Sequence, residues 1–135
     1  MLVPVLRELA VIRQLLSNLA RLDYPADRLD IKIICEASDQ AMQTHLSALT
    51  LPDHFEVIVV PIGSPQTKPR ALNFALAFAR GTLVTVYDAE DAPDPKQLRR
   101  VAAVFADAQR RRGATRRHKR LGAVQCMLTI SNGPE

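Results

Sequence analysis

Short apolar runs alternate along the chain with amphipathic stretches, and this alternation predicts the order of its secondary structure. Pro69 and the pair Asp94–Pro95 stand where a helix is favoured to begin. Helical spacing of apolar residues predicts helices over residues 9–22, 40–50, 69–80 and 95–111. The β-branched apolar runs predict buried strands over residues 2–6, 31–36, 55–60, 82–87 and 123–128.

The regular alternation of strands and helices predicts an α/β fold. Right-handed crossovers would give a Rossmann-like, mainly parallel sheet of about five strands with helices on both faces. With 135 residues, 47% of them hydrophobic, the chain is expected to form a single domain over residues 1–135. Cys35 and Cys126 lie in two of the strand-like runs and are expected to be reduced core residues.

The net charge of +4 is concentrated near the end of the chain, in basic residues at 110–112 and 116–120. This run contains no aromatic side chain that could stack on a base, which argues against nucleic acid as a partner. A solvated loop and a surface that faces anionic lipid both remain open. Neither a signal peptide nor a run of about 20 apolar residues is present, so these residues are expected to be soluble.

The chain changes abruptly from apolar to acidic after residue 87. Asp88, Glu90 and Asp91 follow directly on the strand expected at 82–87. In open α/β sheets, ligands bind just beyond the carboxyl ends of the strands. Two carboxylates spaced Asp-x-Glu on one turn can share a hard divalent cation, which can in turn hold a diphosphate. Simple solubilisation of a loop is the alternative interpretation of these acids.

Two further polar clusters are expected at the same edge of the sheet. Glu36 and Asp39 follow the second strand, and Lys68, Arg70 and Asn73 lie at the start of the third helix. A nucleotide diphosphate needs polar groups for its base and ribose, cations for its phosphates and a metal held by carboxylates. The three clusters together predict such a site, although each residue alone could equally be a surface group, a helix cap or a buried spacer.

Five segments resemble, in order, the motifs of family 2 glycosyltransferases: residues 3–8, 36–39, 68–73, 87–98 and 122–125. They are most similar to the processive, membrane-embedded branch that contains cellulose-synthase-like and related bacterial β-glucan synthases. The resemblance covers nearly the whole chain, and residues 68–98 are its most specific part. It implies a GT-A fold, a nucleotide-sugar donor that is usually UDP-linked, and Mg²⁺ or Mn²⁺ as cofactor.

The resemblance also implies roles for individual residues. Asp39 matches an acid that contacts uracil or ribose, and Asp88 with Glu90 matches the metal-binding Asp-x-Asp motif. Ser38 replaces a frequent aspartate. The metal-binding set is then Asp88, Glu90 and Asp91. Together with the polar clusters, the expected nucleotide-sugar-binding set is Pro4, Glu8, Glu36, Asp39, Lys68, Arg70, Asn73 and Asp88.

Motifs of the family's second half do not occur in these residues. The family has a Thr-Glu-Asp-type motif that supplies the general base and a Gln-x-x-Arg-Trp motif for the acceptor, but this sequence contains no tryptophan. We therefore expect the donor-binding part of a larger, inverting enzyme of the bacterial inner membrane, with this domain cytoplasmic. The parent would transfer a hexose from a UDP-sugar donor to a glycan acceptor, whereas these residues alone would be inactive. An apolar surface left by absent neighbours would favour self-association.

Two other classes of function stay open on the residues alone. A nucleotidylyltransferase also combines a parallel sheet with acidic metal ligands, but it normally carries a glycine-rich signature near the first strand, and residues 2–8 contain no glycine. A response-regulator-like interaction module would bind Mg²⁺ at its strand ends without a nucleotide. Dinucleotide oxidoreductases and P-loop NTPases are disfavoured because their glycine motifs are absent.

Overall fold

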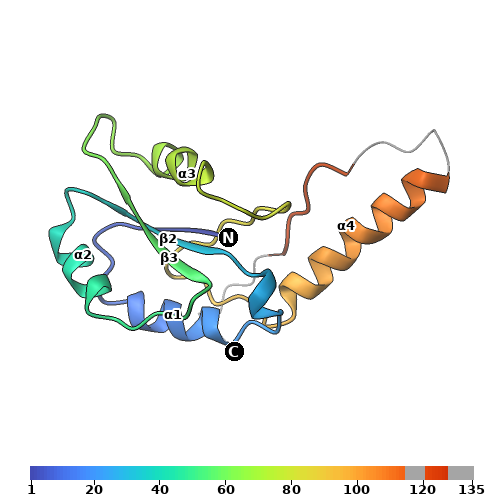
Figure 1. Cartoon of the computed structure of the whole chain (residues 1–135), viewed down its shortest axis with the longest axis horizontal. Coiled ribbons are helices and arrows are strands. Elements are labelled where there is room, and N and C mark those ends of the chain that lie inside the picture. Colours follow the sequence, from blue (N-terminus) through green and yellow to red (C-terminus); the bar gives the residue numbers. More distant parts are fainter. Residues whose placement is uncertain (115–120, 128–135) are drawn as a thin grey trace, which may run out of the picture. The chain divides into compact units, whose positions relative to one another are not determined.

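The computed structural model describes residues 1–114 and 121–127 (Figure 1). The chain divides into two compact units, Met1–Lys96 and Gln97–Glu135. The sheet and the candidate site both belong to the first unit, so each unit is described by itself. The interpretation of residues 1–135 as a single domain stays a prediction.

The first unit is built on a parallel sheet. Its three strands are β1 (Leu2–Val5), β2 (Ile31–Glu36) and β3 (Phe55–Val60), in the order β1-β2-β3. All six residues of the central strand β2 are buried, which explains why the strand carries apolar residues on both of its faces. Only Ile58 and Val60 of β3 are buried, as expected for a strand at the edge. The α/β class and the parallel sheet are confirmed.

Helices cover both faces of this sheet (Figure 1). Helix α3 (Lys68–Leu76) lies on one face, while α1 (Ile12–Ala20) and α2 (Gln40–Ser47) lie on the other. A single 3₁₀ turn, Ala26–Arg28, precedes β2. Under α3 the side chains alternate along the strands as the pleat requires. They form one apolar cluster of Leu2, Ile34, Ile58, Val60, Ala71 and Ala75.

The apolar spacing of Leu9, Ile12, Leu16, Leu19 and Leu22 predicts the buried side of α1, and this prediction was partly wrong. The helix buries Ile12, Leu15 and Leu19, whereas Leu16 is only half-buried and Leu9 is exposed before the helix begins. Adjacent leucines at 15 and 16 satisfy the helical period equally well, so the sequence alone could not decide between them. Helix α3 also ends earlier than expected, at Leu76 instead of Arg80.

The predicted fourth strand, residues 82–87, is not formed as a strand. Thr85 O accepts from the backbone N–H of Leu2 at 2.8 Å and the N–H of Tyr87 donates to Leu2 O at 3.1 Å, which leaves one parallel bridge between Leu2 and Val86. The segment therefore lies beside β1, where a fourth parallel strand would pair. Three of its apolar side chains, Leu83, Val84 and Val86, are more than 40% exposed. Within the described residues, it has a partner on one side only, so the expectation of a buried strand was wrong.

The second unit contains helix α4 (Gln97–Ala114), which begins two residues after the predicted start. Asp94 Oδ1 accepts from the N–H of Lys96 at 2.7 Å, so this carboxylate closes the turn before the helix. Residues 123–127 do not form the expected fifth strand, and Leu128 lies outside the described residues, as does the basic run at 116–120. A strand needs a paired neighbour, and Met127 is 94% exposed.

The two cysteines differ. Cys35 is free and buried as expected, and burial raises the pKa of its thiol. Cys126 is free and exposed, so its assignment to the core was wrong.

Among the helices that the structure describes, none combines the length and the apolar content that crossing a bilayer requires.

Candidate nucleotide-diphosphate site

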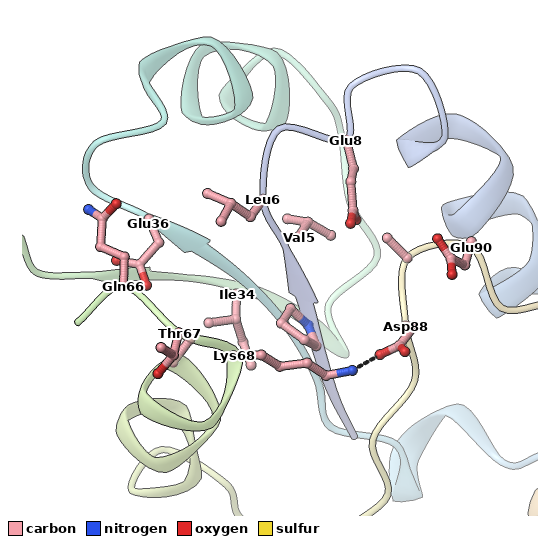
Figure 2. Close-up of a pocket in the computed structure, with 13 residues that line it drawn as sticks. Val5, Leu6, Glu8, Ile34, Glu36, Gln66, Thr67, Lys68, Asp88 and Glu90 are labelled. Atoms are coloured by element: carbon pink, nitrogen blue, oxygen red, sulfur yellow. Dashed lines mark hydrogen bonds and ion pairs between the residues drawn. The ribbon is translucent and has the colours of Figure 1, made fainter. Parts of the chain in front are cut away.

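A cavity of about 330 Å³ opens at the carboxyl edge of the sheet (Figure 2). It is bordered by the end of β1, the end of β2, the first turn of α3 and the turn at 88–90. Six residues of the predicted set line it: Pro4, Glu8, Glu36, Lys68, Asp88 and Glu90. The sequence motifs, which are up to 86 positions apart in the chain, thus meet around one pocket, as the topology of a parallel sheet predicts.

The acidic turn places its carboxylates in different directions. Asp88 lines the pocket and forms an ion pair with the Nζ of Lys68 (Figure 2). Asp91 instead accepts the N–H of Asp88 on its Oδ2 at 2.7 Å, and the N–H of Asp91 donates back to Asp88 O at 3.0 Å. Asp91 closes the turn and does not line the pocket. The structure therefore offers Asp88 and Glu90, but not Asp91, as carboxylates for an ion at this position.

Glu8 carries an unsatisfied group at the pocket. Its Oε2 is buried and has no hydrogen-bond partner. Burial raises the pKa of Glu8, repulsion by Glu90 and Asp88 raises it further, and Lys68 offsets only part of this effect. A buried acceptor without a partner is costly and uncommon in native proteins. Among the pocket residues, Glu8 therefore gives the clearest indication that a ligand binds here.

Asp39 lies outside the pocket lining. Its Oδ1 accepts the N–H of Met42 at 3.1 Å as the N-cap of α2, and its Oδ2 accepts the N–H of Arg7 at 2.7 Å. Arg7 has a left-handed backbone with φ of 59°, a conformation that costs about 1 kcal/mol for a residue other than glycine. The carboxylate of Asp39 thus fixes the loop that presents Glu8, and its proposed contact with a nucleotide stays a prediction.

Arg70 points to protein groups instead of the pocket. Its Nη1 lies 3.3 Å from Oε2 of Glu36, and its Nη2 donates to Pro61 O at 2.6 Å. Asn73 is exposed and is not among the pocket residues either. Both positions had been expected to contact the nucleotide, and the structure does not bring them to the pocket. A helix turns by about 100° per residue, so only Lys68 and Ala71 of α3 face the cavity.

Other pocket residues were not predicted. Leu6, Gln66 and Thr67 line the cavity, and Gln66 Nε2 donates to Ser38 Oγ at 2.9 Å. Gln66 and Thr67 immediately precede Lys68, on the loop that follows the carboxyl end of β3. Their position after a predicted strand could have indicated that they line a site. Glutamine and threonine, however, have no chemistry that distinguishes site residues from ordinary loop residues. Across the described ranges 1–114 and 121–127, no three histidine, cysteine or acidic side chains are grouped closely enough to hold a metal ion.

Comparison with known proteins agrees with this geometry. The family model described as "Glycosyltransferase like family 2" matches residues 1–135. The chain belongs to this family. Among its relatives, the beta-monoglucosyldiacylglycerol synthase of Synechocystis sp. is 36% identical over 134 residues, and the match covers 98% of this chain and 26% of the relative. Family membership decides against the nucleotidylyltransferase and interaction-module alternatives.

Solved structures of other proteins share the fold. The mannosyltransferase PcManGT of Pyrobaculum calidifontis, in complex with GDP-Man and Mn²⁺, superposes with a TM-score of 0.65 at 29% identity, over 78% of this chain and 31% of that one. TarS of S. aureus (residues 1–349), in complex with UDP-GlcNAc, gives a TM-score of 0.61 at 24% identity, over 80% and 31% of the two chains. The chain therefore spans between about a quarter and a third of the length of the Synechocystis relative and of these two solved chains.

Proposed function

We propose that these residues bind the nucleotide-sugar donor, a UDP-hexose, together with Mg²⁺ or Mn²⁺ in a family 2 glycosyltransferase. The single observation that carries the proposal is the pocket that gathers Glu8, Glu36, Lys68, Asp88 and Glu90 at the carboxyl edge of the sheet. Nucleotide-sugar donors are bound in the neighbours TarS, with UDP-GlcNAc, and PcManGT, with GDP-Man and Mn²⁺, which supports the general class of donor.

The charge of the pocket supports a divalent cation. Four carboxylates line the cavity, those of Glu8, Glu36, Asp88 and Glu90, whereas only Lys68 inside it and Arg70 behind Glu36 are positive. Four negative against two positive groups leave a formal balance of −2. Carboxylate oxygens are also the ligands that Mg²⁺ and Mn²⁺ prefer. The buried, unpartnered Oε2 of Glu8 supports the same conclusion.

Three residues of the pocket would bind the metal diphosphate. Asp88 and Glu90 would hold the ion, which when bound neutralises charge on the departing diphosphate. Lys68, in the first turn of α3, would bind a phosphate oxygen, where the free N–H groups of the helix also favour anions. The acceptor hydroxyl attacks the anomeric carbon in a single displacement while a base removes its proton. We propose that this base comes from the part of the enzyme that these residues do not include.

The test is calorimetry on the 135-residue chain with Mn²⁺ alone, UDP alone and both together. Two carboxylates give few ligands to a metal by itself, so we expect binding only when UDP supplies further oxygens. A ligand at about 100 times its Kd should then raise the free energy of unfolding by about 2.7 kcal/mol. Asp88→Asn should abolish the combined effect and leave the fold intact.

Asp107→Asn is the matched control, because Asp107 is an exposed partner of Arg111 on α4. It should bind UDP and Mn²⁺ as the unaltered chain does. Equal stabilisation by Mn²⁺ with and without UDP would contradict the proposal, and so would sugar transfer by these residues alone.

The acceptor is proposed to be a growing glycan. A lipid is the second candidate, favoured by the name of the Synechocystis relative, a beta-monoglucosyldiacylglycerol synthase that is 36% identical to this chain. We further propose that the parent enzyme resides in the bacterial inner membrane with this domain in the cytoplasm. Transfer by the parent enzyme to diacylglycerol but not to an oligosaccharide would reject the glycan.

Self-association of the isolated residues is also proposed. Leu83, Val84 and Val86 belong to the segment beside β1 and are each more than 40% exposed. Adjacent exposed apolar side chains at a sheet edge favour association with a second copy. Light scattering should show species larger than 15.0 kDa, and a monomer at high concentration would reject the idea.

A further inference from the structure

The pocket has two chemically different ends, which Figure 2 shows on opposite sides of Lys68. One end carries the carboxylates of Glu8, Asp88 and Glu90. The other end holds a single buried carboxylate, that of Glu36, which is only 4% exposed. The apolar side chains of Leu6 and Ile34 line the pocket on the side of this second carboxylate (Figure 2). If the proposed function holds, the acidic end suits a metal diphosphate, and the apolar end suits a flat base with a polar edge.

Arg70 restrains the carboxylate at the base end. Its Nη1 lies 3.3 Å from Oε2 of Glu36 and its Nη2 donates to Pro61 O at 2.6 Å, so the guanidinium is held at two points. Pro61 directly follows β3, and Arg70 lies in the first turn of α3. The guanidinium therefore joins the ends of two strands to a helix. It contacts Oε2 of Glu36, so a ligand of the kind inferred here would meet Oε1.

The number of free carboxylate oxygens matters for the choice of base. The pairing edge of uracil offers one N–H between two carbonyl oxygens, which a single acceptor satisfies. Guanine offers two adjacent donors, N1–H and N2–H, which match the two oxygens of an unrestrained carboxylate. A site that leaves a buried donor unpaired rejects that ligand strongly. We propose that Arg70 is a specificity-determining residue that favours UDP over GDP by holding Oε2 of Glu36.

Gly63 provides an independent way to test this arrangement. A Cβ atom built at Gly63 would lie 2.5 Å from Nη2 of Arg70. The clash is with the far end of a flexible side chain, so Gly63→Ala should displace the guanidinium and leave both charges of the pair in place. The variant thus changes the position of Arg70 without leaving Glu36 as an unpaired buried charge.

The experiment measures the affinities of UDP and GDP in saturating Mn²⁺ by calorimetry on the 135-residue chain. The unaltered chain should bind UDP at least tenfold more tightly than GDP. Arg70→Met should reduce this ratio at least fivefold, mainly by tighter GDP binding. Gly63→Ala should change the ratio in the same direction by about twofold to threefold, whereas Arg70→Lys, which retains one cationic donor, should preserve most of it.

Arg111→Met, the same change at an exposed ion pair on α4, is the control and should leave the ratio unchanged. A purely structural role of Arg70 would weaken both nucleotides equally, and an unchanged ratio in both Arg70→Met and Gly63→Ala would overturn the inference. A preference of the unaltered chain for GDP would overturn it as well, although the proposed function would stand. Failure of both nucleotides to bind with Mn²⁺ would instead overturn the proposed function, and this inference with it.

Discussion

The two ends of β2 both carry a buried charged side chain on the face covered by α3, but their surroundings differ. Lys32, near the start of the strand, is 1% exposed and Glu36, at its end, is 4% exposed. Lys32 forms ion pairs with Asp30 at 2.8 Å and with Glu56 on the neighbouring strand. Arg80 adds a further ion pair to Asp30 at 2.9 Å. Among these four side chains two cations thus balance two carboxylates, so the side chains around Lys32 sum to zero charge.

The end of β2 that borders the pocket is not balanced in this way. Four carboxylates face two cations, and one oxygen of Glu8 is buried without a partner. An uncompensated buried charge is costly, and neutralisation by a bound ligand is one reason for a protein to retain it. A buried charge by itself therefore does not mark a functional site, and the charge balance of its surroundings is what separates the two ends of this strand.

The pKa shifts favour the charged forms in one region and disfavour the charged form in the other. Burial alone would raise the pKa of Asp30, but hydrogen bonds from Lys32 and Arg80 outweigh it and hold that pKa well below its usual range. Burial likewise lowers the pKa of Lys32, and its ion pairs with Asp30 and Glu56 more than reverse this. At the pocket, burial and repulsion by neighbouring acids raise the pKa of Glu8. The first region favours the charged forms, and the second disfavours the charge it carries.

Removal of the central cation should have the largest effect on stability. Lys32→Met leaves Asp30 without one of its two partners in a largely buried position, and breaking a buried pair typically costs about 3–5 kcal/mol. We expect the free energy of unfolding to fall by about 3 kcal/mol, at the lower end of this range. The reason is that Glu56, the other partner of Lys32, has a half-exposed side chain that water can solvate once the cation is removed. Urea denaturation measures the loss, and UDP with Mn²⁺ should bind the folded variant as before.

Lys96→Met, the same change at an exposed lysine, should alter the free energy of unfolding by less than about 0.5 kcal/mol. A Lys32→Met variant as stable as this control would contradict the distinction drawn between the two ends of β2.

Truncation of Asp39 should have an intermediate effect. Asp39→Ala removes the cap of α2 and the acceptor for the N–H of Arg7, and loss of an N-cap costs about 1 kcal/mol. Because the Arg7 loop presents Glu8, we also expect UDP to bind more weakly with Mn²⁺. Asp39→Asn keeps one acceptor oxygen and should lose about half as much stability. A tenfold loss of UDP affinity in Asp39→Asn at unchanged stability would instead favour the direct nucleotide contact that the family resemblance implies.

The smallest effect is expected at Glu8, and it depends on pH. Since the folded pKa lies above the ordinary value, the folded state binds this proton more readily than the unfolded state does. The stability linked to this group is therefore present below about pH 4.5 and is lost as the pH rises through the folded pKa. Glu8→Gln should stabilise the chain at pH 7 by less than about 1 kcal/mol, with the gain disappearing below pH 4.5.

Thermal unfolding across this pH range is the measurement, and Glu56→Gln at the neutral end of β2 is the comparison. Glu56 pairs with the buried Lys32, so its neutralisation should destabilise the chain at pH 7. A Glu8→Gln variant that is destabilised to the same degree would mean that the carboxylate of Glu8 is already compensated, against the charge balance described for the pocket.

Local patterns in the sequence determined much of the fold. The three strands and the helices α1 to α4 occur where apolar periodicity, prolines and caps predicted them, because these signals act within a few residues. The position of the pocket also followed from the sequence. Parallel strands bring their carboxyl ends to one edge, so polar residues directly after such strands had to meet there.

Tertiary structure alone decided what individual side chains do. Residues 82–87 have strand-like composition, but pairing depends on neighbours, and the segment has β1 on only one side within the described residues. Asp39 and Asp91 look like ligands in the sequence, yet their carboxylates accept backbone N–H groups. Lys32 lies in an apolar run with nothing to mark it, and its burial depends on Asp30, Glu56 and Arg80. The sequence gives the type of each side chain. The hydrogen bonds and the charge balance of that side chain depend on residues that only folding brings together.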